Sequence, residues 1–249
     1  GVVTGPDPEL DLDGARRLGV AFVELLDLSG GTLVMGHDMR QLGEELSAAF
    51  ADGARRAGAS IIDLGLTSTD LLWFGSGQLD LPGVQFTASH NPARYNGMKF
   101  CLAGASPVRP GFTAELRERA ATAVIGEKIV GGYEERDLTA DFVSHLDHLV
   151  PMSGQRRLRV VVDAGNGMGG LIVPAVLADR EVDLIGLYMD LDGTFPNHPA
   201  NPLEPENLVD ARSAVREHCA DLGLVFDGDA DRCFLIDERG EVVDPSVVT

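Results

Sequence analysis

Residues 222–236 read LGLVFDGDADRCFLI and combine two apolar runs with an acidic loop between them. The runs at 222–226 and 233–236 predict two β-strands, and the polar residues between them predict a tight connection. Asp227, Asp229 and Asp231 occupy alternate positions, separated only by glycine and alanine, so their carboxylates can converge on one hard cation such as Mg²⁺. Arg232 adds a planar, two-pronged donor suited to phosphate. We therefore expect a metal-dependent phosphate site in this loop.

Three other interpretations of the acidic loop stay open at this point. An EF-hand would use Asp227, Asp229, Asp231 and Glu238 at positions 1, 3, 5 and 12, but its sixth position needs glycine and here holds Arg232. A haloacid-dehalogenase-like phosphatase would use Asp227 as nucleophile and Asp229 as acid, yet that family typically carries threonine or valine where this chain has Asp231. A solvated acidic turn would leave the apolar flanks unexplained.

Outward from this loop, short β-rich runs alternate with helical patterns, which is typical of α/β architecture. We expect two consecutive related domains, each a mixed β-sheet sandwiched between helices. The expected strands cover residues 32–36, 59–64, 84–87, 98–102, 158–162, 182–189, 222–226 and 233–236. A helix over 138–149, ended by Pro151, is expected to link the two domains.

The stretch 87–92 reads TASHNP and follows one of the expected strands. Pro92 fixes its own backbone angle and biases Asn91 away from helix, so the loop is tight and can expose the hydroxyl of Ser89. Serine is a weak nucleophile unless a base, a metal or a phosphoryl donor lies around it, which draws attention to His90 and Lys99. An ordinary Ser-His surface turn is the alternative.

A glycine-rich loop at 165–170, GNGMGG, satisfies the G-x-G-x-x-G pattern of dinucleotide-binding folds, with Asp190 twenty residues further on. Against that interpretation, Asp163 precedes the first glycine, where such a strand usually stays apolar. A dinucleotide-binding module therefore remains an alternative.

The amino-acid composition limits the kinds of partner that the protein can bind. Acidic residues outnumber basic ones by 39 to 20, giving a formal charge of −19 that would repel nucleic acid and anionic membranes. Three cysteines without C-x-x-C spacing fit a reducing compartment. No apolar stretch approaches the roughly 20 residues that a membrane helix needs. We expect a cytoplasmic protein, and the first residue, Gly1, suggests a piece of a longer chain.

Taken together, the TASHNP and DGDADR strings, about 140 residues apart, resemble the two active-site loops of the α-D-phosphohexomutases. Residues 36–40, GHDMR, resemble that family's G-x-D-x-R segment, and 195–208 resemble its bacterial phosphomannomutase/phosphoglucomutase branch. The resemblance implies domain 1 over 1–135, domain 2 over 136–249 with the start of domain 3 at its end, and two further domains, 3 and 4, beyond this chain.

The resemblance also implies roles for individual residues. Ser89 would carry the phosphoryl group, and its phosphate oxygen would complete the Mg²⁺ ligands Asp227, Asp229 and Asp231. Arg40, Lys99 and Arg232 would bind phosphate, Lys99 and Arg232 would also stabilise its transfer, and His90 would position or exchange a proton with the sugar.

The implied reaction interconverts hexose 1-phosphate and hexose 6-phosphate through a hexose 1,6-bisphosphate. The two loop variants favour mannose or glucose phosphates over glucosamine phosphate. Because the family's initial Lys/Tyr–Arg segment, sugar-reading loop and phosphate clamp are missing, we expect the chain to bind metal but to turn over poorly.

Overall fold

The computed structural model describes residues 1–6, 8–151, 156–244 and 246. The chain divides into two compact units. Unit 1 comprises Gly1–Thr87 and Arg94–Leu138, and unit 2 comprises Ala88–Ala93 and Thr139–Thr249. The serine loop is thus grouped with the second unit although the sequence on both sides of it belongs to the first. The expected start of a third domain reaches residues 245 and 247–249, which lie outside the described residues.

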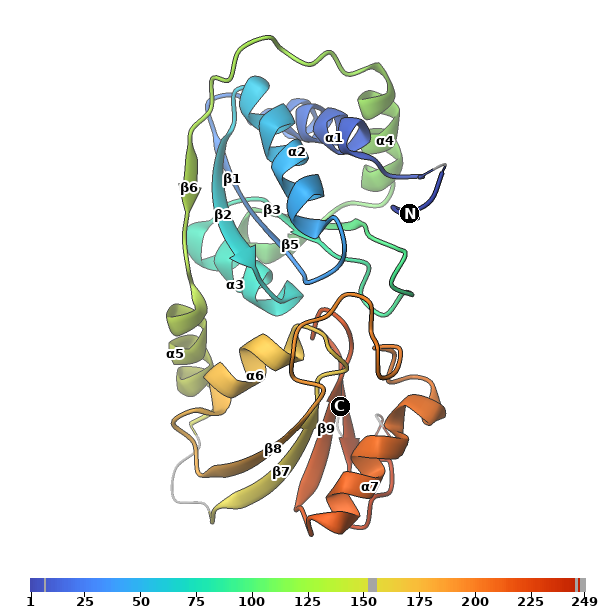
Figure 1. Ribbon diagram of the computed structural model, residues 1–249. Helices are drawn as coiled ribbons and strands as arrows, with labels where there is room; N and C mark the ends of the chain where they lie inside the picture. Colours follow the sequence, from blue (N-terminus) through green and yellow to red (C-terminus); the bar gives the residue numbers. More distant parts are fainter. Residues whose placement is uncertain (7, 152–155, 245, 247–249) are drawn as a thin grey trace. The chain divides into compact units, whose positions relative to one another are not determined.

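Unit 1 is built on a six-stranded mixed sheet with the strand order β5-β4-β3-β1-β2-β6 (Figure 1). Strands β3, β1, β2 and β6 run parallel, whereas β4 is antiparallel to both β3 and β5. The strands are β1 (Thr32–His37), β2 (Ser60–Leu66), β3 (Gly83–Phe86), β4 (Met98–Leu102), β5 (Ser106–Pro107) and β6 (Tyr133–Glu135).

Helices cover both faces of this sheet because side chains alternate along β1. Leu33 and Met35 are buried in the larger core with residues of α1 (Leu12–Leu25), α2 (Gly43–Arg56) and α4 (Phe112–Thr122). Val34, between them, packs in a second cluster with Leu72 of α3 (Thr69–Leu79). A short 3₁₀ turn, Ala103–Ala105, joins β4 to β5. Both faces of β1 are therefore buried, as expected for a strand in a sheet that lies between helices.

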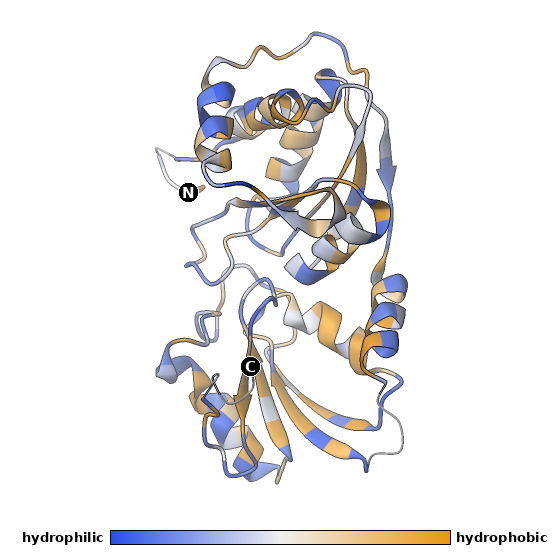
Figure 2. Cartoon of the chain, turned by 180° about the vertical axis from the view of Figure 1, so that it is seen from behind, coloured by the Kyte–Doolittle hydropathy of each residue, from blue (hydrophilic) through white to orange (hydrophobic). Residues whose placement is uncertain are grey.

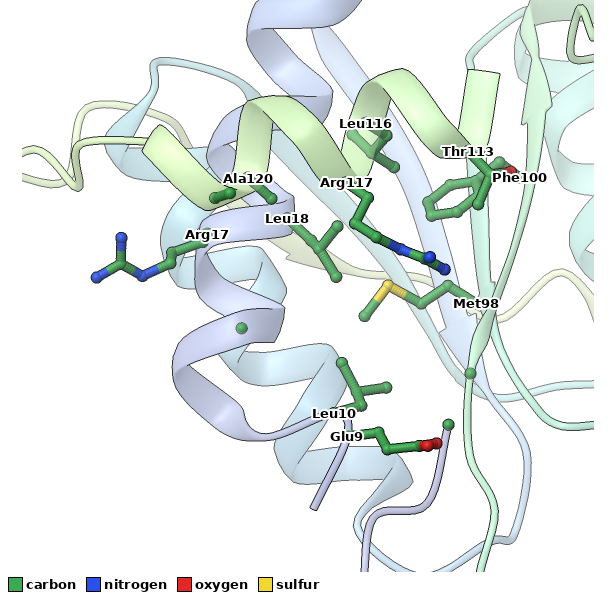
Figure 3. A pocket seen from close by; sticks show the side chains of 14 residues that line it. Glu9, Leu10, Arg17, Leu18, Met98, Phe100, Thr113, Leu116, Arg117 and Ala120 are labelled. Atoms are coloured by element: carbon green, nitrogen blue, oxygen red, sulfur yellow. The ribbon is translucent and has the colours of Figure 1, made fainter. Parts of the chain in front are cut away.

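Unit 1 also contains a pocket of about 800 Å³ between α1, α4 and β4 (Figure 3). Leu18, Leu116, Met98 and Phe100 give it an apolar lining, and Arg117 extends over it. Among the described residues that line it, none is one of the expected site residues.

Unit 2 contains a four-stranded mixed sheet with the order β10-β9-β7-β8. Strands β8, β7 and β9 are parallel, and β10 is antiparallel to β9. The strands are β7 (Leu158–Asp163), β8 (Val182–Leu187), β9 (Leu222–Phe226) and β10 (Cys233–Ile236).

Helices lie on both faces of this second sheet as well (Figure 1). Val161 of β7 and Val225 of β9 are buried with residues of α7 (Val209–Glu217), which follows a 3₁₀ turn at Pro205–Leu208. On the other face, α6 (Gly169–Leu177) begins against Phe226 and is hydrophobic along most of its length (Figure 2). Helix α5 (Thr139–Leu149) packs beside α6.

The expected fold class is confirmed: both sheets are mixed and both lie between helices. The expected strands at 98–102, 222–226 and 233–236 match β4, β9 and β10, and the others differ by one or two residues at an end, as in β8. The expected helix at 138–149 corresponds to α5. Within the described residues, no helix is long and apolar enough to cross a membrane.

Candidate metal and phosphoryl-transfer site

The acidic loop begins at the carboxyl end of β9, which is parallel to its neighbour β7. Carboxyl ends of parallel strands are the edge at which α/β sheets place their ligand sites. Asp227 follows directly after Phe226, the last residue of β9, and the chain reverses within six residues to enter β10 at Cys233. The β9–β10 hairpin thus presents the loop at this edge.

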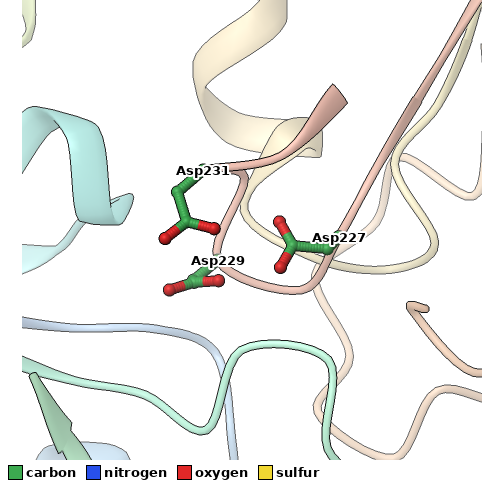
Figure 4. A group of neighbouring side chains, drawn as sticks. All are labelled: Asp227, Asp229 and Asp231. Carbon is green, nitrogen blue, oxygen red and sulfur yellow. The ribbon is translucent and has the colours of Figure 1, made fainter. Parts of the chain in front are cut away.

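The three carboxylates of the loop face one another (Figure 4). One oxygen from each of Asp227, Asp229 and Asp231 lies within 4.8 Å of the other two. Asp227 and Asp229 have no exposed surface, and Asp231 is partly exposed. Burial and the negative charges of Asp229 and Asp231 raise the pKa of Asp227 to about 6. The loop therefore concentrates negative charge on one partly exposed and two buried carboxylates.

The turn is held by its own backbone. The Ala230 amide donates to the Asp227 carbonyl at 3.1 Å, and the Arg232 amide donates to Asp227 Oδ1 at 3.1 Å. Ala230 has a φ of +60°, in the left-handed region that a residue with a Cβ enters at a cost of about 1–2 kcal/mol. Such strain is typical of functional loops, where the surroundings fix the conformation.

Ser89 meets this loop directly. Its Oγ donates a hydrogen bond to Asp227 Oδ2 at 2.8 Å. Ser89 also has a left-handed φ of +53°. The neighbouring turn is closed by Asn91, whose backbone and side-chain amides both donate to the Ala88 carbonyl, at 3.0 and 2.8 Å. The loop that the sequence marked as exposed thus directs its hydroxyl at a buried carboxylate.

Arg232 connects the two loops. Its Nη2 donates to Ser89 Oγ at 2.6 Å, and its Nε donates to Asp227 Oδ2 at 3.0 Å. The guanidinium is also 3.6 Å from a carboxylate oxygen of Asp231. About a third of its side chain is exposed, so the cation can reach an added group at Ser89.

His90 contacts the same guanidinium nitrogen as Ser89. Arg232 Nη2 donates to His90 Nδ1 at 2.6 Å. Arginine has no acceptor, so Nδ1 must carry the lone pair and the ring proton must sit on Nε2. His90 is therefore a neutral imidazole in this arrangement, oriented by Arg232. A groove of about 560 Å³ in unit 2 begins at His90 and runs past Phe195 and Asn201.

The remaining expected residues, Arg40 and Lys99, belong to unit 1. Arg40 has no exposed side-chain surface: its Nε is 3.4 Å from Asp38 Oδ2 and its Nη1 donates to the Tyr95 carbonyl at 3.1 Å. Lys99 is the second residue of β4, partly buried, opposite Gln85 of β3. Thus Ser89, His90, Arg232 and the three aspartates lie together in unit 2.

The donor set of the loop fits a small divalent cation. Three carboxylate oxygens within reach of one another, two of them from fully buried side chains, are hard ligands whose mutual repulsion a cation would relieve. Asp227, Asp229 and Asp231 would hold the ion. Because they come from one short turn, all three lie within reach of a single ion.

The EF-hand interpretation is wrong. That motif places its loop between two helices, whereas residues 227–232 join the antiparallel strands β9 and β10. Here Arg232, at the sixth position of the loop, binds Asp227 instead of providing a glycine turn.

The dinucleotide interpretation also conflicts with the structure. A pyrophosphate would need free amides at the start of α6. The Met168 amide instead donates to the Gly228 carbonyl at 2.9 Å, and a Cβ at Gly170 would lie 1.9 Å from the Met189 carbonyl oxygen. The glycines therefore permit close packing against the protein's own backbone.

One polar pair at this edge was not predicted. His198 Nε2 is 3.2 Å from both carboxylate oxygens of Asp163, at the end of β7. The available signal was Asp163 itself, a charged residue at the end of an apolar strand. Its partner could not be identified, since His198 lies in a proline-rich stretch that was expected only to cap a helix.

Comparison with known proteins gives a consistent result. The family model described as phosphoglucomutase/phosphomannomutase, alpha/beta/alpha domain I, matches residues 2–124, and the corresponding domain II model matches residues 140–240. The phosphohexose mutases of Xanthomonas campestris pv. campestris are 40% identical over 243 residues, covering 96% of this chain and 53% of that protein. The phosphomannomutase of Salmonella typhimurium is 38% identical, covering 95% and 54%.

Among solved structures, a phosphoglucomutase/phosphomannomutase family protein from Burkholderia thailandensis superposes with a TM-score of 0.88 at 33% identity. The match covers 98% of this chain and 54% of that one. The chain therefore spans about half the length of the relatives it matches.

Proposed function

Because the chain belongs to the phosphoglucomutase/phosphomannomutase family, we propose that it carries the phosphoryl-transfer half of a hexose-phosphate mutase. The reaction interconverts hexose 1-phosphate and hexose 6-phosphate of mannose, glucose or both. The observation that supports it best is the placement of the Ser89 hydroxyl 2.8 Å from Asp227 within the carboxylate loop. On this proposal residues 1–135 and 136–249 are the first two domains of a longer enzyme whose domains 3 and 4 complete it, and its free thiols suit the cytoplasm.

The proposed transfer starts from phospho-Ser89. A hydroxyl oxygen of the hexose monophosphate forms a new bond to phosphorus, and the bond from phosphorus to Ser89 Oγ breaks. The proton lost by the sugar hydroxyl is returned to Ser89 Oγ, so charge and atoms balance. The bisphosphate then reorients, and its other phosphoryl group returns to Ser89 by the reverse step.

Each residue has a task in this scheme. Asp227, Asp229 and Asp231 would hold Mg²⁺, and a phosphate oxygen on Ser89 would supply a further ligand. When bound, the ion would offset negative charge on the transferring oxygens.

Arg232, which already contacts Ser89 Oγ, would bind the phosphoryl group with its forked donors. His90, held with its proton on Nε2, would exchange a proton with the sugar hydroxyl. The assignment of Arg40 and Lys99 to phosphate binding, and of Lys99 to charge stabilisation, rests on the family resemblance alone.

Intact-mass measurement tests the proposal on the chain as it is. Incubation with glucose 1,6-bisphosphate and Mg²⁺ should add one phosphoryl group, and Ser89→Ala should abolish the addition. Ser213→Ala, a serine of α7 in the same unit, is the matched control and should still be phosphorylated. Phosphate located on Asp227 would instead favour the phosphatase alternative, and tight NADH binding without modification would favour the dinucleotide module.

A further inference from the structure

The glycine turn, residues 164–168 at the end of β7, packs against the carboxylate loop, residues 227–232. A Cβ at Gly167 would lie 2.6 Å from the carbonyl oxygen and 2.9 Å from the Cα of Gly228. The next residue, Met168, donates its amide to that same carbonyl at 2.9 Å. Gly228 separates Asp227 from Asp229, so a displacement of the turn would change the spacing of two expected metal ligands.

Asp163 and His198 both contact this turn at Gly165. Asp163 is fully buried, and its Oδ1 accepts the Gly165 amide at 2.9 Å. Gly165 has a φ of +51°, and a Cβ there would lie 3.3 Å from Ala200 and 3.4 Å from the His198 ring. His198 thus packs against the turn, which lies between the end of β7 and residues 197–200.

The two nitrogens of His198 both face acceptors. Nε2 is 3.2 Å from each oxygen of the Asp163 carboxylate, and Nδ1 is 2.9 Å from the Pro199 carbonyl oxygen. A carbonyl and a carboxylate cannot donate, so both ring nitrogens must carry protons and the ring is an imidazolium.

The charged groups around the ring favour this cation. Tyr188 contacts the ring edge-to-face at 5.3 Å between centroids, and its hydroxyl donates to Asp210 at 2.7 Å. Burial disfavours the charged ring, but Asp163, the Pro199 carbonyl and Asp210 outweigh it and raise the pKa of His198. If His198 were neutral, Asp163 would be a buried anion without this cationic partner, and burying an unpaired charge destabilises the fold.

We propose that His198, paired as an imidazolium with Asp163, is a positioning residue that fixes the glycine turn and, through Gly167 and Gly228, the spacing of Asp227 and Asp229. The inference rests on the proposed metal site. It gives the G-x-G-x-x-G motif a role: its close-packed backbone transmits the position of the Asp163–His198 pair to the metal loop.

Mn²⁺ binding, followed by the electron paramagnetic resonance signal of the free ion, tests this step separately from turnover. His198→Gln leaves Asp163 without a cation and should weaken Mn²⁺ binding about tenfold, within the range of 10–100-fold for residues that orient metal ligands. Adding Asp163→Asn should restore most of the loss, because the buried charge is then gone. His218→Gln, an exposed histidine at the end of α7, is the matched control and should bind like the unchanged chain.

The pH dependence of Mn²⁺ affinity separates the charge of His198 from its packing, because loss of packing alone would not depend on pH in this way. The affinity difference between the unchanged chain and His198→Gln should be largest below the raised pKa of His198 and should vanish above it. Equal Mn²⁺ affinity of the two proteins across that range would overturn the inference and leave the metal site standing. Failure of the unchanged chain to bind Mn²⁺ would overturn both.

A second measurement needs no substitution. Long-range ¹H–¹⁵N spectra of the unchanged chain should show His198 mainly protonated on both nitrogens at about pH 6.5, the ordinary histidine pKa, at which an unperturbed ring is half neutral. A neutral ring at that pH would contradict the proposal even if His198→Gln failed to fold.

Discussion

Ser89 Oγ donates to Asp227 Oδ2 at 2.8 Å across 138 positions of sequence. The contact lies within unit 2, because the loop Ala88–Ala93 is grouped with the β9–β10 hairpin. It joins the residue expected to carry a phosphoryl group to one expected to bind the metal.

Mg²⁺ should stabilise the chain more strongly as the pH rises through about 6. In the metal-free protein the pKa of Asp227 is raised to about 6, from an ordinary value of 3.8. The stability that the protonated Asp227 carboxyl contributes is therefore complete below pH 3.8 and is lost as the pH rises through about 6. Mg²⁺ binds the ionised carboxylate and should offset this loss. Thermal unfolding with and without Mg²⁺ should show a larger shift at about pH 7 than at about pH 5; equal shifts would contradict the prediction.

Asp229→Asn should have opposite effects on stability with and without metal. Without Mg²⁺ it removes one of the negative charges that raise the pKa of Asp227, so the free energy of unfolding should rise. With Mg²⁺ it removes a ligand, so the stabilisation by the ion should largely disappear. Urea unfolding in chelator and in Mg²⁺ measures both effects. Asp179→Asn, an exposed carboxylate of unit 2, should leave both values unchanged within about 0.5 kcal/mol.

Arg232→Lys should slow phosphorylation of Ser89 by about 10–100-fold, since lysine keeps the charge but loses the forked donors that reach Ser89 and Asp227 together. The initial rate of phosphate incorporation from glucose 1,6-bisphosphate measures the effect. Arg216→Lys, on the exposed end of α7, is the control and should match the unchanged chain. An unchanged rate in Arg232→Lys would remove the guanidinium from the proposed mechanism.

Phe22→Ala should destabilise the fold by about 3–5 kcal/mol. Phe22 is fully buried in unit 1, and its ring contacts those of Phe50, Phe100 and Phe112 at 5.5–6.2 Å between centroids. Chemical denaturation monitored by circular dichroism gives the change. Phe22→Leu keeps most of the buried area and should cost less than half as much; equal losses would mean that buried apolar area is not what stabilises the fold at this position.

Local pattern was enough to predict several parts of the molecule. Strands β9 and β10 and the loop between them follow from apolar runs on either side of alternating aspartates, because burial and turn preference act over a few residues. The elements that the same reasoning did not predict include β6, whose residues Tyr133–Glu135 are all exposed, and α3, whose apolar residues are consecutive in Leu71–Phe74 and show no helical period.

The sequence by itself determined the α/β class, the acidic loop and the identity of the candidate residues, since each depends on side-chain chemistry and short spacing. Only the tertiary structure decided that Ser89 bonds to Asp227, that His90 takes its proton on Nε2 beside Arg232, and that Asp163 is paired with His198. These contacts join segments 35–142 positions apart. The packing of strands and loops brings these residues together, and the residue pattern of a short stretch of sequence does not predict which of them will meet.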